Sequence, residues 1–114
     1  MIIIKLLVFN KEEADAVANS ILKNKFALNV FGSAFDSYHL NSAHTTAHTK
    51  VHVVQFVTKS MLFNEIDSIL KKEFPDTDFY MIATPIVHIA INLHDKIKNR
   101  VNGLDLVDGK KTEN

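Results

Sequence analysis

The order of its apolar patterns constrains this chain more than any other feature. Runs and alternations typical of strands, and apolar residues recurring every three or four positions as in helices, follow one another along the chain. The order is strand, helix, strand, strand, helix, strand and a short closing helix, over residues 2–9, 11–25, 27–40, 48–58, 60–74, 79–87 and 93–101. Two strand-helix-strand halves in succession predict a βαββαβ layout, an α+β protein with an antiparallel sheet in a two-layer sandwich.

The strands differ in what they predict about their place in the sheet. The first is an unbroken apolar run rich in β-branched residues, which is typical of a central strand. Gly32 interrupts the second strand, and we expect a bulge or bend there. Residues 41–46 have loop composition and predict a turn that sets the third strand antiparallel to the second. Pro85 cannot donate a ladder hydrogen bond, so its segment belongs at an edge, a bulge or a strand end.

Helix ends are also predicted from local chemistry. Asn10 can cap the first helix, and Glu13 stands at the capping-box position three residues later. Ser60 and Asn92 are the expected caps of the second and third helices. Pro75 removes a donor and restricts the residue before it, so it should end the second helix.

Length and composition bound the class of protein. The 114 residues, 46% of them hydrophobic, suit a single globular domain, which we place at residues 1–103, followed by a polar tail at 104–114. Thirteen basic residues balance thirteen acidic ones, so the basic excess that nucleic-acid binding needs is absent and we expect no nucleic-acid partner. The sequence has no cysteine, which excludes disulfides and thiolate metal sites.

The apolar start of the chain does not predict export or membrane insertion. It has Lys5 inside the run and no small-residue cleavage site after it. No apolar stretch approaches the roughly 18 residues that a membrane span needs. We therefore expect a soluble cytoplasmic protein without a membrane partner.

Three segments of the chain resemble the CutA family of divalent-cation-tolerance proteins. They are residues 22–30 after the first helix, residues 54–60 with a strand end like the family's Lys-Thr, and residues 74–86 from Phe-Pro to Pro-Ile. The resemblance runs over about residues 2–101. It implies a ferredoxin-like core, assembly as a homotrimer and a non-enzymatic role in cation tolerance, with weak binding of a divalent metal.

The same comparison also defines where this chain departs from the family. Leu28 or Asn29 replaces the family's cysteine, and Thr77 replaces a glutamate. The chain has no Trp, so the Tyr-x-Trp-x-Gly pattern of the long hairpin is missing. These departures indicate a divergent member whose site residues cannot be carried over from the family pattern.

Four of the six histidines lie close together and are the candidate metal ligands. They are His39, His44, His48 and His52, and the candidate ion is copper or zinc. Along a strand, His48 and His52 stand roughly 13 Å apart, whereas zinc ligands lie about 2.0–2.1 Å from the ion. A site would therefore need His39, a flexible His44, or histidines of another subunit meeting at a trimer axis. Two other interpretations stay open: solvent-facing hairpin residues, and a cluster that senses pH.

Other functions have less support in the sequence. The serines stand in no nucleophile-elbow pattern, so we expect no enzyme. A nucleotide- or effector-sensing regulator like the PII signalling proteins, which the CutA family resembles in architecture, is one alternative. The three glycines of the chain provide no phosphate-binding loop for it. A structural trimer or adaptor without a ligand is a second alternative. A ferredoxin-like dimer that binds small aromatics or catalyses monooxygenation is a third, and it should show an enclosed apolar pocket within one sandwich. In a trimer, the second and third strands and the Pro85 segment are the expected contacts between subunits.

Overall fold

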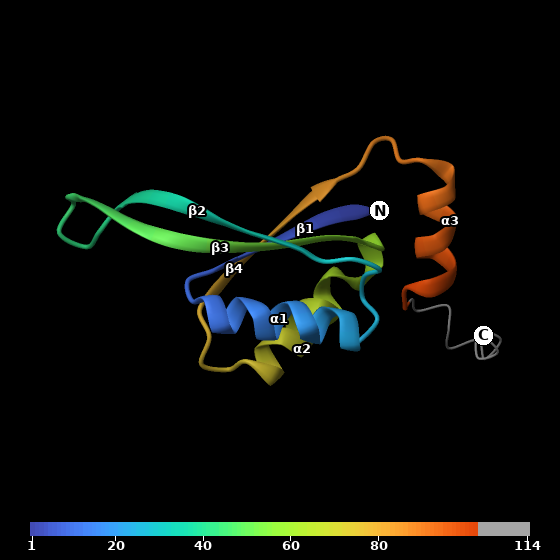
Figure 1. The fold of residues 1–114 in the computed structure, drawn as a ribbon, viewed down its shortest axis with the longest axis horizontal. Coiled ribbons are helices and arrows are strands. Elements are labelled where there is room, and N and C mark those ends of the chain that lie inside the picture. Colours follow the sequence, from blue (N-terminus) through green and yellow to red (C-terminus); the bar gives the residue numbers. More distant parts are fainter. Residues whose placement is uncertain (103–114) are drawn as a thin grey trace.

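A computed structural model of the chain describes residues 1–102 and confirms the predicted element order. The elements are β1 (Ile2–Val8), α1 (Lys11–Lys23), β2 (Phe31–Leu40), β3 (Thr46–Thr58), η1 (Ser60–Leu62, a 3₁₀ turn), α2 (Phe63–Glu73), β4 (Phe79–Pro85) and α3 (Ile91–Arg100). Within these residues the strands form one antiparallel sheet in the order β2-β3-β1-β4. This is the ferredoxin-like α+β sandwich, with α1 and α2 on one face and α3 beyond one end of the sheet (Figure 1).

The strand register divides the sheet into two faces. Ile4 pairs with Phe56 on one side and Ala83 on the other, and Leu6 pairs with Val54 and Met81. Side chains alternate along a strand, so these residues face the helices and their neighbours face away from them. We call the second surface the open face; its large apolar residues are Ile3, Leu7, Phe31, Phe35, Val51, Val53, Tyr80 and Ile82.

The core lies between the sheet and the two covering helices. The fully buried side chains of β1 and β3 meet Val17 and Ile21 of α1 and Ile66 and Leu70 of α2. Ile97 of α3 joins the same cluster at the end of the sheet. Each helix thus buries one apolar stripe, as the spacing of three and four predicts.

The β2–β3 hairpin projects past the helices and is closed by one asparagine. The Asn41 side-chain oxygen accepts hydrogen bonds from the backbone N–H groups of Ala43 and Thr45 and from the Thr45 hydroxyl, at 3.0–3.1 Å. His44, inside this turn, has a positive φ of 63°. The turn predicted at residues 41–46 is confirmed, with β3 beginning at Thr46.

Four strand boundaries differ from those predicted: β1 ends at residue 8 and not 9, β2 starts at 31 and not 27, β3 starts at 46 and not 48, and β4 ends at 85 and not 87. Residues 27–30 do not extend β2, because Phe26 and Ala27 are buried in the core and the Phe26 carbonyl accepts a hydrogen bond from Thr58. The bulge expected at Gly32 is wrong: residue pairs run one to one through this position, from Phe31 opposite Gln55 to Leu40 opposite Thr46. At the other end, β4 stops at Pro85 on an edge strand, as proline predicts.

The predicted helix caps are confirmed at only one of three sites. Asn10 accepts a hydrogen bond from the Glu13 N–H at 3.1 Å, and the Glu13 carboxylate accepts one from Thr77 instead of closing a capping box. Ser60 begins a 3₁₀ turn, and α2 starts after Leu62 without a side-chain cap. Asn92 lies inside α3, whose N-cap is Ala90.

The predicted domain and the predicted tail extend beyond residues 1–102. The single domain at residues 1–103 and the polar tail at 104–114 stay predictions, because the last residue of the domain and the whole tail lie outside the described residues. None of the described helices is long and apolar enough to cross a membrane.

Candidate functional site

The four candidate histidines are divided between the two sides of the hairpin. His39 is opposite Ala47 and belongs to the open face. His48 is opposite Tyr38 and His52 opposite Ala34 and Val8, which places both on the helix-facing side. His44 occupies the turn. One chain therefore presents His39 and the His48–His52 pair in opposite directions.

His48 contacts two neighbours on the hairpin, Asp36 and Tyr38. Its Nε2 atom lies 3.1 Å from Asp36 Oδ1, and the Lys50 ammonium donates to the same oxygen at 3.0 Å. The Tyr38 ring stacks on the imidazole with centroids 4.8 Å apart and an interplanar angle of 17°. Hydrogen bonds from Lys50 and then from His48, which favour the ionised carboxylate, hold the pKa of Asp36 below its ordinary value of 3.8.

His52 lies in a groove between the sheet and the first helix. The groove holds about 230 Å³ and is lined mainly by small side chains of α1 and β2, with Lys11 and Asp15 at its rim. Lys11 Nζ and Asp15 Oδ1 pair with each other at 2.8 Å on the exposed side of α1. This pairing leaves the groove without a free carboxylate to complete a metal site with His52.

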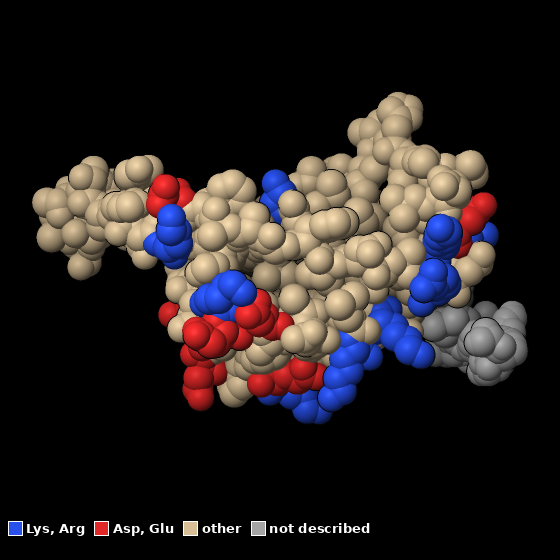
Figure 2. Space-filling view, viewed as in Figure 1, with Lys and Arg blue, Asp and Glu red and all other residues tan. Residues whose placement is uncertain are grey.

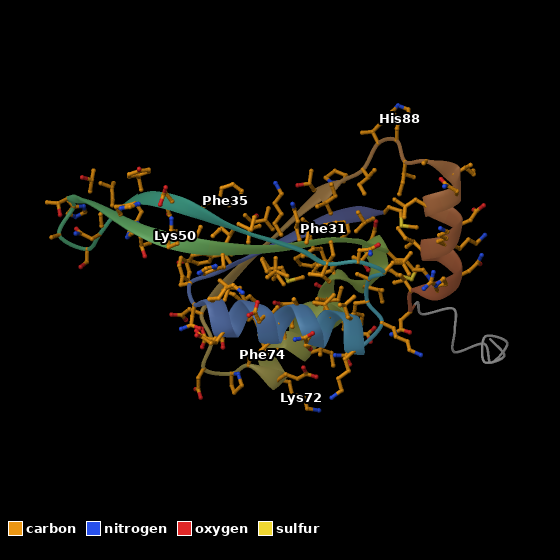
Figure 3. All side chains as sticks on the ribbon, viewed as in Figure 1. Phe31, Phe35, Lys50, Lys72, Phe74 and His88 are labelled. Carbon is orange, nitrogen blue, oxygen red and sulfur yellow. The ribbon has the colours of Figure 1, made fainter. Side chains whose placement is uncertain are left out.

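The remaining histidines lie far from the hairpin. His88 is in the loop between β4 and α3, where Figure 3 shows it at the end of the molecule opposite the turn. His94 is on α3, with its Nδ1 atom 3.4 Å from Asp95 Oδ1. Across residues 1–102, no group of three or more His, Cys, Asp or Glu side chains could hold a metal ion within one chain. Metal binding by the four predicted ligands stays a prediction, and histidines of a neighbouring copy are one way to complete such a site.

The open face exposes several large apolar side chains. Phe31 is 60% exposed, Phe35 54% and Tyr80 64%, and Phe9 packs edge-on against Tyr80 with ring centroids 5.8 Å apart. Figure 3 shows Phe31 and Phe35 on the side of the sheet away from α1 and α2. In Figure 2 most charged side chains lie over the helices, and Lys5 is the one lysine that the register of the described strands places on the open face. Soluble monomers rarely expose an apolar surface of this kind, so it indicates an interface.

A shallow hollow on the open face brings one histidine next to aromatic rings. It holds about 490 Å³ and its lining residues are Leu7, Phe9, Ser37, His39, Leu40, Thr49 and Tyr80. His39 is thus the predicted metal ligand that lies on the surface most suited to contact another copy.

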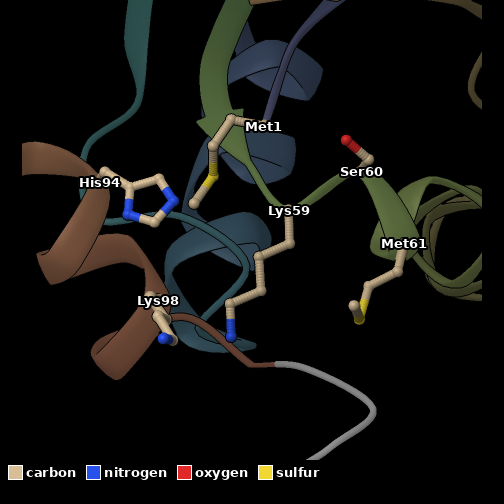
Figure 4. A pocket seen from close by; sticks show the side chains of 6 residues that line it. All are labelled: Met1, Lys59, Ser60, Met61, His94 and Lys98. Carbon is tan, nitrogen blue, oxygen red and sulfur yellow. The ribbon is translucent and has the colours of Figure 1, made fainter. Parts of the chain in front are cut away.

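A second hollow was not predicted from the sequence. It holds about 470 Å³ and lies between the end of β3, the following 3₁₀ turn and α3 (Figure 4). Lys59 and His94 are among its lining residues. The only sequence signal for this hollow was the Lys59-Ser60 pair, which resembles the family's strand end. No sequence pattern links that pair to a helix some forty residues later, so the hollow could not be predicted.

Comparison with solved structures shows that CutA proteins have the same fold. CutA from Archaeoglobus fulgidus, described as a periplasmic divalent cation tolerance protein, superimposes with a TM-score of 0.78 at 22% identity, covering 90% of this chain and 100% of that one. CutA1 from Oryza sativa gives 0.77 at 20% identity, covering 89% and 93%. CutA1 from Pyrococcus horikoshii gives 0.80 at 14% identity, covering 90% and 100%.

Comparison by sequence finds no match for this chain, although comparison by structure finds several. No protein-family model matches the chain, and no curated protein matches it. The architecture is a ferredoxin-like sandwich, and within that class the chain has the fold of CutA proteins with a strongly diverged sequence.

Proposed function

We propose that the chain is a divergent CutA-type protein that assembles as a homotrimer through its open face. The observation that carries this proposal is the apolar open face itself, which exposes Phe31, Phe35 and Tyr80 on a sheet whose other face is covered. Self-association buries this surface. The net charge of zero offers little electrostatic repulsion against it.

The proposed role is non-enzymatic and cytoplasmic, of the cation-tolerance type. His39 lies on the open face, so assembly through this face would bring it close to side chains of neighbouring copies. A weak site for copper or zinc built from several copies satisfies the geometry that one chain lacks. Neutral imidazole is a suitable ligand for both ions.

The first experiment measures the mass of the assembly. Size-exclusion chromatography with light scattering should give three times the 12.9 kDa of one chain. Phe35→Glu places a charge on the open face and should yield a monomer. Leu22→Glu changes an exposed apolar residue of α1, on the covered side of the sheet, and is the matched control that should stay a trimer. A monomeric or dimeric wild type would contradict the proposal.

Ligand screening separates this role from the first two alternatives. If nucleotides raise the melting temperature and copper and zinc do not, the protein belongs with the sensing regulators. If neither class of ligand changes the melting temperature, a structural trimer or adaptor is the better description.

A further inference from the structure

The hollow at the end of β3 combines positive charge with an apolar wall. Its lining residues are Met1, Lys59, Ser60, Met61, His94 and Lys98. All of them lie outside the four strands, at the end of the sheet next to α3. Its volume of about 470 Å³ lies within the range of roughly 300–1,000 Å³ that is usual for small-molecule pockets.

Lys59 is the unusual residue of this hollow. It is 9% exposed and is the only charged residue in the buried class among residues 1–102. Three other lysines (Lys11, Lys50 and Lys71) pair with carboxylates, whereas Lys59 forms no ion pair with any acidic residue of the described chain. The carbon stem of a lysine is often covered in this way while its ammonium group reaches the surface. No buried side-chain nitrogen or oxygen of the described residues lacks a hydrogen-bond partner.

The third helix adds further positive charge to the same hollow. His94 and Lys98 are four residues apart, so they lie on one face of α3, and the buried Ile97 anchors that helix to the core. Figure 4 shows the two lysines on opposite sides of the hollow, Lys98 on α3 and Lys59 just after β3. Asp95 contacts His94 but is not part of the lining.

The positive charge of these side chains favours an anion as the ligand of this hollow. Two ammonium groups that line one hollow repel each other, and an anion bound between them is attracted to both. The Ser60 hydroxyl can donate a further hydrogen bond. Met1 and Met61, which flank Lys59 in Figure 4, provide a flexible apolar surface for the body of a ligand.

We propose that this hollow binds a small organic anion. The phosphate or carboxylate group of the ligand lies between Lys59 and Lys98, next to His94, and its apolar part rests against Met1 and Met61. Phosphate and carboxylate share the chemistry that two lysines recognise, so the experiment must separate them.

The test is calorimetric titration of the full-length protein with three probes: phenyl phosphate, phenylacetate and inorganic phosphate. We expect an aromatic anion to bind more tightly than inorganic phosphate, because only the former uses the methionine wall. Tighter binding of phenyl phosphate than of phenylacetate assigns a phosphate ligand, and the reverse order assigns a carboxylate. The proposal is overturned if neither aromatic anion binds at about 10 mM, where a Kd near 1 mM is already measurable.

Charge-matched variants locate the site. Lys59→Met should weaken binding by about tenfold or more, the usual effect of losing a charged hydrogen bond. Lys98→Gln should also weaken it, whereas Lys96→Gln removes the same charge from α3 outside the lining and should change the affinity by less than about twofold. Equal losses at Lys96 and Lys98 would mean that net charge, and not this hollow, attracts the anion.

A spectroscopic readout keeps the proposal testable if Lys59→Met does not fold. In the wild-type protein, backbone amide resonances of Lys59, Ser60, Met61 and His94 should shift during titration with phenyl phosphate or phenylacetate. Shifts confined to the hairpin or to other parts of the surface would contradict the proposed location.

Discussion

Thr58 ends β3 inside the core, where its hydroxyl group needs a partner. The side chain is fully buried, and its Oγ1 atom donates to the Phe26 carbonyl at 2.6 Å. This bond ties the segment after α1 to the end of the sheet. It also explains why residues 27–30 pack beneath the sheet edge and do not continue the second strand as predicted.

Replacement of Thr58 by valine should therefore destabilise the fold. The change keeps the side-chain shape but leaves a buried carbonyl without its donor, which costs about 1–3 kcal/mol in the free energy of unfolding. Urea unfolding at one fixed protein concentration measures the loss. Thr46→Val, at the exposed start of β3, is the matched control and should change the free energy by less than about 0.5 kcal/mol. Equal effects of the two changes would show that the hydrogen bond is unimportant.

The hairpin carboxylate makes a second prediction at the scale of single residues. Hydrogen bonds from Lys50 and His48 lower the pKa of Asp36 below 3.8, so the ionised form is favoured in the folded protein. The stabilisation is therefore present above the unfolded-state pKa and is lost as the pH falls through the lower folded-state value. NMR titration of the Asp36 carboxyl carbon should give a midpoint below 3.8. Lys50→Met should raise it, and an unchanged midpoint would contradict this account.

At the scale of elements, the order of strands and helices was predictable but several of their ends were not. Apolar periodicity indicates which residues are buried against the opposite layer of the sandwich. The period differs between helices and strands, so the order of these elements can be predicted from it. The same signal cannot distinguish a strand from a buried connection such as Phe26-Ala27. A polar residue before an apolar stripe also does not show whether the backbone there forms a helix cap. At Ser60 the backbone forms a 3₁₀ turn instead.

The two asparagines predicted as caps test this distinction directly. Asn10→Ala removes the acceptor for the Glu13 N–H and should cost about 1 kcal/mol of stability. Asn92 lies inside the first turn of α3, where its side-chain oxygen accepts a hydrogen bond from the Leu93 N–H at 3.0 Å. Alanine is the better helix former there, so Asn92→Ala should cost less than about 0.5 kcal/mol. Thermal or urea unfolding of both variants makes the comparison. A loss at Asn92 equal to that at Asn10 would contradict the observed start of α3.

At the scale of the whole molecule, the candidate sites divide into those that sequence can find and those that only the fold brings together. The histidine cluster is visible in the sequence because its members are close along the hairpin, but alternation sends His39 and His48 to opposite faces. The hollow around Lys59 shows the reverse case. Its two lysines come from the strand end and the last helix, and only the docking of α3 against the sheet places them together.

Metal binding, if it requires assembly, should depend on the histidine of the open face. Copper or zinc should raise the melting temperature of the wild-type protein, and His39→Gln should remove most of that rise because its imidazole lies on the proposed interface. His88→Gln changes a histidine outside the hairpin and should retain the rise. The monomeric Phe35→Glu variant keeps all six histidines, so it separates chelation within one chain from chelation between chains. A full metal response in that monomer would mean that one chain binds the ion by itself, and the proposed link between assembly and metal would be wrong.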